Sequence, residues 1–510
     1  MSLSTTMQRD RAATSGAARA AWFKISVESR LAQFLALAIA ALLFRGATFG
    51  EWNYDTDEQF YALVGRRMLD GATLYVDIWD RKPPALYLVY AAIALLSRSV
   101  LAFQLTATVS AVLGAYGITR IAVRFAGAMP ALMAGIAYLA LLGRFGGACG
   151  QAPVWYTSLM IFAARTIVSR MDLLRRGCID AMVAAGMAAA GLAVAFKQSA
   201  AIECGFVGLF IAALLLTSRG PLWRAIAQIA LLAVLALLPM AMTFAWYWHI
   251  GHLPELWQAL VSSNFARLYE GPWGRIWRLG IMLGLLGMPI VFAALGWSML
   301  KADERRDPRL VLIAAWAIVA VLAVVVFPNI FYHYAIPILP SLCILCAILF
   351  ERWTMGRVAF VAVVGVSLLF GNTLNLPTRI RAHQSAPELV DYVRAETPHK
   401  RLLIWGIPNY LYVLVGARPP APLAFPPHLY EGAESGVSGV DEVEEMRRII
   451  AGRPEAVVVQ HPLPARPINM ANVNQLGAYL KTCRRLRTFT IYDHNGAQKQ
   501  DVYSRCGQRG

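Results

Sequence analysis

Charged side chains are scarce in this chain. Asp, Glu, Lys and Arg make up only 15% of its 510 residues, whereas 58% are hydrophobic. With a mean hydropathy of +0.52, this composition excludes an ordinary soluble protein and indicates a membrane protein. The charges that remain are unbalanced, with 47 Lys and Arg against 30 Asp and Glu and a net charge of +17. Because the basic residues lie mostly in short loops between apolar runs, we attribute the excess to membrane topology, and no nucleic-acid partner is expected.

Several other signatures are missing. The seven cysteines show no metal-ligand spacing, and Cys343 and Cys346 are predicted to pack inside an apolar helix. The final third has no glycine-rich phosphate loop. We find no pair of interrupted helices at matching places in two halves, which argues against a transporter built from repeats. No small-x-small cleavage site follows the first apolar stretch, so residues 1–30 are predicted to be a basic cytoplasmic tail and not a signal peptide.

The apolar runs predict a polytopic α-helical membrane protein with about eleven transmembrane helices in the domain 31–372. The predicted helices cover 31–49, 99–118, 128–144, 154–169, 179–196, 199–217, 225–247, 279–299, 310–327, 335–350 and 358–372. The basic clusters share the side of the N-terminus, which predicts that this side is cytoplasmic. The acidic loop 50–98 and everything after about residue 373 are then extracytoplasmic. Arg45, in the first helix, is predicted either to snorkel outward or to face the bundle interior, with snorkelling slightly favoured.

The more polar segment 378–510 predicts a small extracytoplasmic α/β domain. Helices are expected at 385–396, 440–452 and 474–486, strands at 401–407 and 456–460, and a hairpin over 489–505 that turns at Asn495-Gly496. Cys483 and Cys506 flank this hairpin and are predicted to form a disulfide in an oxidising compartment. The domain is expected to contact the acceptor or to cover the active site, with plain structural support as the alternative.

The most polar stretch before the final third is the segment 53–87, in the loop after the first helix. Thr56, followed by Gln59 three residues later, matches a capping box and predicts a helix start. The apolar residues that follow lie on one face, which is typical of a helix on the membrane surface. Pro83 and Pro84 predict the first turn of a second short helix that runs to about Leu96.

This loop also carries a recognisable pattern. Asp57-Glu58 open the first short helix, Tyr75, Asp77 and Asp80 follow in a turn, and Lys82-Pro83-Pro84 with Tyr87 open the second helix. The pattern resembles the membrane glycosyltransferases of the GT-C fold, most of all the bacterial relatives of protein O-mannosyltransferases and of the lipid A aminoarabinose transferase. The resemblance covers the loop closely and the hydrophobic two thirds of the chain loosely. It implies a GT-C fold and a polyprenyl-phosphate-linked sugar as donor. It also implies a glycan, lipid or protein hydroxyl as acceptor, at the outer face of a bacterial inner membrane.

The resemblance further implies inverting transfer, with Asp57 as the general base and Glu58 orienting acceptor or donor. Lys82 and Lys197, with Arg81, would neutralise the charge on the departing lipid phosphate. The remaining residues taken as substrate-binding are Tyr87, Gln151, His333 and Tyr334. No cofactor is assigned and no metal ligand is named, with a divalent cation left open.

Each of these assignments has a plainer alternative. An acid in the first turn of a helix is favoured by the helix dipole alone, which needs no catalytic role for Asp57. Lys197 is either an ordinary helix-end lysine or a functional one, because a lysine at this depth is costly unless paired, with Glu203 as the expected partner. His333 is equally well explained as an interfacial histidine, and the Trp- and Arg-rich loop 248–278 as a membrane anchor. For the whole chain, the alternatives are a transporter or lipid flippase and a non-catalytic glycan-assembly protein.

Overall fold

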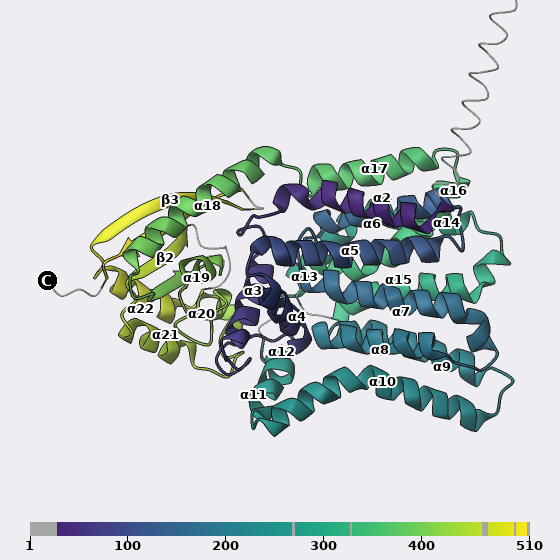
Figure 1. Ribbon diagram of the computed structural model, residues 1–510, viewed down its shortest axis with the longest axis horizontal. Helices are drawn as coiled ribbons and strands as arrows, with labels where there is room; N and C mark the ends of the chain where they lie inside the picture. Colours follow the sequence, from purple (N-terminus) through teal and green to yellow (C-terminus); the bar gives the residue numbers. More distant parts are fainter. Residues whose placement is uncertain are drawn as a thin grey trace, which may run out of the picture.

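The computed structural model describes residues 28–267, 271–326, 329–406, 409–461, 468–493 and 496–506. Long helices run side by side in a bundle, and a small α/β unit lies at one end of it (Figure 1). The bundle helices are α2 (Arg30–Arg45), α5 (Val100–Ala122), α6 (Ala128–Arg144), α7 (Ala152–Arg175), α8 (Ala181–Phe196), α9 (Ala200–Leu216), α10 (Leu222–His249), α13 (Pro272–Leu285), α14 (Gly287–Ser298), α15 (Pro308–Val326), α16 (Leu339–Arg352) and α17 (Gly356–Phe370).

Every apolar range predicted from the sequence overlaps one or more of these helices, which confirms a bundle of apolar helices. Among the described residues, 5 helices are long and apolar enough to cross a membrane, or 6 if the bent pair α13–α14 forms one span. That pair bends by 61° at the place where one straight helix, 279–299, was predicted. Five others, including α6 and α8, are shorter apolar helices, so the expected number of about eleven spans stays a prediction.

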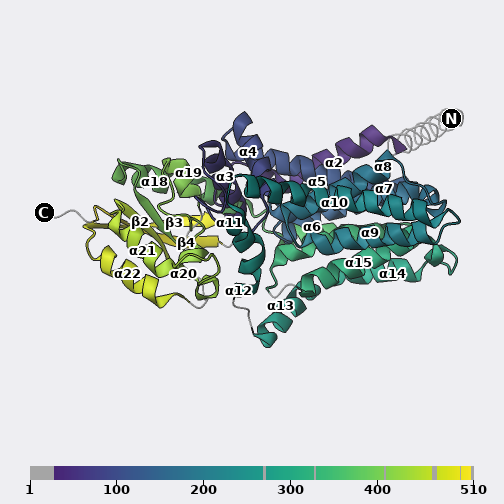
Figure 2. The same ribbon diagram turned by 90° about the horizontal axis from the view of Figure 1, so that it is seen from below.

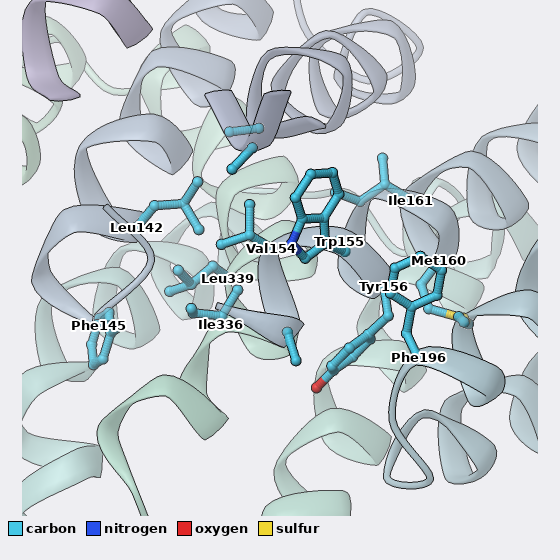
Figure 3. Close-up of a cluster of buried hydrophobic side chains, with 14 of the residues drawn as sticks. Leu142, Phe145, Val154, Trp155, Tyr156, Met160, Ile161, Phe196, Ile336 and Leu339 are labelled. Carbon is cyan, nitrogen blue, oxygen red and sulfur yellow. The ribbon is translucent and has the colours of Figure 1, made fainter. Parts of the chain in front are cut away.

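The core of the bundle centres on α7. Trp155 and Tyr156 of α7 pack among Phe196 from the end of α8 and Ile336 and Leu339 from the segment that leads into α16 (Figure 3). Ile336 belongs to a short 3-10 helix, η4 (Tyr332–Ile338). Between membrane helices such contacts act through van der Waals packing, since lipid tails are as apolar as these side chains. This packing fixes the two chain segments, 197–199 and 331–334, that border the site described below.

Arg45 corrects one prediction, because it does not snorkel. It is 2% exposed, and its guanidinium donates hydrogen bonds to the carbonyl oxygens of Gly147 at 2.7 Å and Cys149 at 3.0 Å. A charge this deep is tolerated because both terminal nitrogens of the guanidinium donate to main-chain oxygens, while Nε has no partner. Arg45 therefore fixes the loop between α6 and α7.

The acidic loop forms the two short helices that the sequence predicts, α3 (Thr56–Leu69) and α4 (Pro84–Leu96). The N-cap of α3 is Asp55, whose carboxylate accepts a hydrogen bond from the Glu58 amide at 2.9 Å. The sequence predicted the capping residue to be Thr56, which is instead the first residue of the helix. Gly65 permits a close crossing, since a Cβ there would lie 2.7 Å from the amide nitrogen of Ala91 in α4. The apolar face of α3 packs on protein, including the short helix α19 (Tyr410–Val415), so it does not rest on the membrane as predicted.

The C-terminal unit has a four-stranded sheet in the order β1-β2-β4-β3. Its strands are β1 (Leu402–Trp405), β2 (Ala456–His461), β3 (Arg485–Asp493) and β4 (Gly496–Ser504), with β1 parallel to β2 and the other pairs antiparallel. One face packs on α21 (Glu442–Ala451) and α22 (Met470–Leu480), and the other on α18 (Leu376–Glu396) and α19. The hairpin and the α/β arrangement are as predicted, and the predicted disulfide between Cys483 and Cys506 is present.

A buried ion pair joins the sheet unit to the bundle. The Arg379 guanidinium on α18 contacts both carboxylate oxygens of Glu51 at 2.6 and 2.8 Å, and it also donates to the Asp493 carbonyl at 2.8 Å. Both side chains of the pair are almost fully buried. The hairpin end is thereby held beside the segment that leads into α3.

Candidate active site

A cavity of about 950 Å³ lies where three parts of the chain meet. The first part is the loop with the segments 53–57 and 80–82, and the second is the bundle side, with the α8–α9 connection and residues 264, 265, 267, 275, 326 and 329–334. The third is the C-terminal unit. Figure 2 shows α12 (Ser263–Ala266) and α13 at the end of the bundle that faces the sheet. Of the sequence-predicted site residues, the lining includes Asp57, Arg81, Lys82, Lys197, His333 and Tyr334.

Asp57 sits at the start of α3 with its carboxylate at the cavity. The Gln151 side chain, at the N-cap of α7, donates a hydrogen bond from Nε2 to Asp57 Oδ2 at 2.7 Å and lies 3.5 Å from Asp55 Oδ1. Gln151 is buried and does not line the cavity. Its predicted contact with substrate is therefore corrected to a contact with Asp57, which it orients.

Glu58 is the second predicted catalytic acid, and the structure places it away from the cavity. It is 2% exposed, accepts a hydrogen bond from the Gly150 amide and lies 3.5 Å from the Tyr90 hydroxyl. Burial, reinforced by the neighbouring Asp55, raises the pKa of Glu58 to about 8. In the structure Glu58 ties α3 to the α6–α7 loop, and its role in orienting acceptor or donor stays a prediction.

This burial predicts a pH-dependent stability. An unfolded glutamate ionises near pH 4.5, whereas folded Glu58 keeps its proton to about pH 8. The protein should therefore lose stability as pH rises from about 4.5 to 8, because only the unfolded state releases the proton in that range. Glu58→Gln keeps the hydrogen bond from Gly150 without a charge, so its melting temperature between pH 5 and 8 should fall less steeply than that of the wild type.

The matched control is Glu388→Gln, at an exposed glutamate on α18, which should retain the wild-type slope. Asp55 has a pKa raised to about 7, by burial first and then by Asp57, so part of the slope should persist in Glu58→Gln. Identical slopes in Glu58→Gln and the wild type would contradict a neutral Glu58.

Lys82 is held by the turn between α3 and α4. Its ammonium lies 3.1 Å from Asp80 Oδ2 and 5.0 Å from the ring centre of Tyr61. Tyr87 is fully buried, and its hydroxyl donates a hydrogen bond to Asp80; its predicted contact with substrate stays a prediction. Burial alone would raise the pKa of Asp80, but Lys82 and Tyr87 outweigh it and leave that pKa below its usual range.

Arg81 already has a counter-charge. It pairs with Glu434 of the C-terminal unit, and Arg267, just after α12, contacts the same carboxylate at 2.6 Å. Burial would raise the pKa of Glu434, but the two guanidinium groups lower it. Arg81 therefore connects the loop to the C-terminal unit, which makes it a weaker phosphate ligand than predicted.

Lys197 differs from Lys82 and Arg81, which are each paired with a carboxylate. It follows α8, and no carboxylate lies within 4.0 Å of its ammonium in the described part of the chain. Its nearest recorded partner is the Tyr334 ring, whose centre is 4.0 Å from Nζ. Burial first, and then the Lys82 charge, lower the pKa of Lys197 to about 7. The predicted partner Glu203 is wrong, because its carboxylate accepts a hydrogen bond from the Trp316 indole at 2.7 Å.

His333 and Tyr334 border the cavity beside Lys197. The His333 ring stacks on Phe331 with 5.7 Å between ring centres, and Tyr334 supplies the face over which Lys197 lies. Gln198, next to Lys197, donates a hydrogen bond to the Arg81 carbonyl at 2.8 Å. The α8–α9 connection and the α3–α4 loop are thus joined directly.

Sequence reasoning missed Glu434, Arg267 and the carboxamide side chains of the sheet that reach the cavity. Glu434 lies in a stretch of the sequence without a periodic pattern or a motif, so no sequence signal identified it as a site residue. Arg267 was read as part of a membrane anchor. In the described residues, no group of three or more His, Cys, Asp or Glu side chains is placed to hold a metal ion.

Comparison with known proteins was informative at the level of structure. No protein-family model matches the sequence, and no curated protein matches it. ArnT from Cupriavidus metallidurans in the apo state superposes with a TM-score of 0.62 and 14% identity, over 96% of this chain and 98% of ArnT. The same protein bound to undecaprenyl phosphate gives 0.60 and 15%, over 93% and 98%.

A second similar structure is the oligosaccharyltransferase AglB from Archaeoglobus fulgidus in complex with an inhibitory peptide and a dolichol-phosphate. It superposes with a TM-score of 0.51 and 12% identity, over 86% of this chain and 70% of AglB. At such low identities the likeness bears on architecture alone. The chain has the GT-C fold of membrane glycosyltransferases, as the pattern in its first loop implied.

Proposed function

We propose that this protein is an inverting glycosyltransferase that moves a sugar from a polyprenyl-monophosphate carrier to a hydroxyl group of an envelope glycan, lipid or protein. One observation carries the proposal. A single cavity contains the Asp57 carboxylate, oriented by Gln151, and the Lys197 ammonium, which has no carboxylate within 4.0 Å in the described chain. A base and a buried cation without a counter-charge are what transfer from an anionic leaving group requires.

In the proposed step, Asp57 takes the proton from the acceptor hydroxyl. The acceptor oxygen forms a bond to the anomeric carbon from the face opposite the phosphate, and the bond between that carbon and the phosphate oxygen breaks. The departing polyprenyl phosphate carries away the electron pair. Lys197, supported by Lys82, offsets the negative charge that develops on it. Attack from the opposite face inverts the anomeric configuration.

The similar structures support the choice of carrier. ArnT binds undecaprenyl phosphate in one of the structures to which this chain is similar, and AglB binds a dolichol-phosphate in another. The α3–α4 loop and the C-terminal unit, which line the cavity, lie at one end of the helix bundle (Figure 1), and this position supports a lipid-linked phosphate as donor.

The direct test is an assay of the purified full-length protein in lipid vesicles. Undecaprenyl-phosphate sugars are supplied as donors with an envelope extract as acceptor, and the release of undecaprenyl phosphate is measured. The proposal expects release that depends on both donor and extract. Movement of the lipid-linked sugar across the bilayer without release would instead favour the flippase alternative, and neither activity would favour an assembly protein.

The proposed orientation places the N-terminus in the cytoplasm of a bacterial inner membrane and the C-terminal unit outside. The Cys483–Cys506 disulfide is consistent with an oxidising compartment. A reporter active only in the cytoplasm, fused after Gly510, should therefore give no signal, whereas the same reporter fused before Met1 should be active. A strong signal from the C-terminal fusion would mean that the cavity faces the cytoplasm, which contradicts the proposed orientation.

A further inference from the structure

The cavity has two chemically different ends. Its lysines and arginines come from the bundle side: Arg81 and Lys82 from the α3–α4 loop, Lys197 from the α8–α9 connection, and Arg267 and Arg275 from the region around α13. The strands β2 and β4 contribute only glutamines to the described lining, namely Gln460, Gln498 and Gln500. Asn53, four residues before Asp57, lines the cavity as well. We call these four side chains the carboxamide patch.

The sheet register explains how the patch forms. Gln460 of β2 lies opposite Gln500 of β4, and Gln498 is two residues from Gln500, so all three project from one face. The same face carries Val458 and Val502, which are buried in the apolar core. The face therefore changes from aliphatic to carboxamide where it reaches the cavity.

The patch contains polar atoms without partners. Asn53 is 3% and Gln500 1% exposed. Asn53 donates through Nδ2 to the Tyr492 carbonyl at 3.3 Å, but its Oδ1 has no hydrogen-bond partner, and neither has Oε1 of Gln500. Both residues line the cavity, but these two oxygens are themselves covered. The part of the patch that a bound group meets is therefore Gln460 and Gln498, whose side chains are partly exposed.

We propose that the carboxamide patch binds the acceptor, and that the acceptor is an uncharged sugar unit of a glycan. The proposal deepens the proposed function and rests on it. Each carboxamide offers an acceptor oxygen and a donor NH₂ group, which together suit sugar hydroxyls, since each hydroxyl both donates and accepts. A phosphorylated headgroup would find no cation from β2 or β4 in the described lining, because Lys499 of β4 alternates with Gln498 and Gln500 and projects from the opposite face. Because Asn53 directly precedes the segment that carries Asp57, a sugar held there has its hydroxyls beside the proposed base.

The proposal is tested with defined probes on the full-length protein in nanodiscs, by saturation-transfer NMR. The probes are methyl glycosides of mannose, galactose, glucose and N-acetylglucosamine, with glycerol 1-phosphate and a serine-containing tripeptide amide as alternatives. At least one glycoside should bind in preference to both alternatives. Gln460→Ala and Gln498→Ala, at partly exposed positions, should each weaken it by about five-fold, the usual effect of one neutral hydrogen bond.

Gln475→Ala is the matched control, since this glutamine of α22 bonds the Val443 carbonyl on the far side of the sheet; it should bind the glycoside like the wild type. Binding of undecaprenyl phosphate, measured in parallel, should be unchanged in all three variants. The proposal is overturned if no glycoside binds, if glycerol 1-phosphate or the peptide is preferred, or if the patch variants bind glycoside normally. Patch-dependent glycoside binding in a protein that neither binds undecaprenyl phosphate nor transfers sugar would instead remove the proposed function and leave the sugar site in place.

Discussion

Asp57→Asn should lower the rate of sugar transfer by about 100- to 10,000-fold, the usual contribution of a positioned general base. The substitution keeps the shape of the side chain, and the Asn oxygen can still accept the hydrogen bond that Gln151 donates to Asp57. What the amide cannot do is take the acceptor proton. The protein should therefore fold, enter the membrane and bind undecaprenyl phosphate as the wild type does. The measurement is the transfer rate in lipid vesicles, with donor binding determined separately.

The neighbouring acids supply the controls for this result. Asp55→Asn should have the mildest effect, because asparagine is as good an N-cap as aspartate and preserves the bond to the Glu58 amide. Glu58→Gln should have an intermediate effect, through the packing of α3 on the α6–α7 loop. If Asp57→Asn turns over normally while Asp55→Asn is inactive, the base is misassigned. If all three variants stay active, the loop is not the catalytic centre.

Lys197→Ala should weaken the binding of undecaprenyl phosphate by about 10- to 100-fold, which corresponds to one charge-assisted hydrogen bond. The effect should exceed that of Lys82→Ala, because the Lys82 charge is already offset by Asp80 at 3.1 Å. Lys197→Arg should restore binding only in part, since a planar guanidinium does not replace a compact ammonium. Lys481→Ala, at an exposed position after α22, is the control and should bind donor normally.

The same lysine predicts how donor binding depends on pH. Its pKa is lowered to about 7, and only the protonated form attracts a phosphate. Affinity for undecaprenyl phosphate should therefore fall as pH rises through 7, and this fall should be smaller in Lys197→Arg, because arginine stays charged. Normal donor binding by Lys197→Ala at every pH would return Lys197 to an ordinary helix-end lysine.

The sequence predicted the features that depend on local chemistry. Hydropathy located the bundle helices, Pro83 and Pro84 marked the start of α4, and Asn495-Gly496 with the alternation around it marked the final hairpin. The loop motif was enough to identify the fold. These signals work because helix length, proline geometry and hairpin turns are decided within a few residues.

Partners across the fold could not be predicted in the same way. Glu203 lies close in sequence to Lys197 but contacts Trp316. Arg81 was predicted to be a phosphate ligand, but in the structure it pairs with Glu434, more than 350 residues away in the sequence. Tyr87 and Gln151 contribute to the site through their hydrogen bonds to Asp80 and Asp57, respectively. Whether a polar residue contacts substrate or another residue of the protein depends on tertiary packing. A pattern of residue types in the sequence does not contain this information.

The Glu51–Arg379 pair has a consequence for evolution and for engineering. A chimaera that received a foreign C-terminal unit without an arginine at this place would leave Glu51 buried without its partner, which typically costs about 3–5 kcal/mol. The helix bundle and the C-terminal unit can therefore diverge in sequence. They can be exchanged between proteins only if both residues of the Glu51–Arg379 pair are retained. Recombination, in nature or in the laboratory, should succeed at crossover points that keep residue 51 and residue 379 from the same parent.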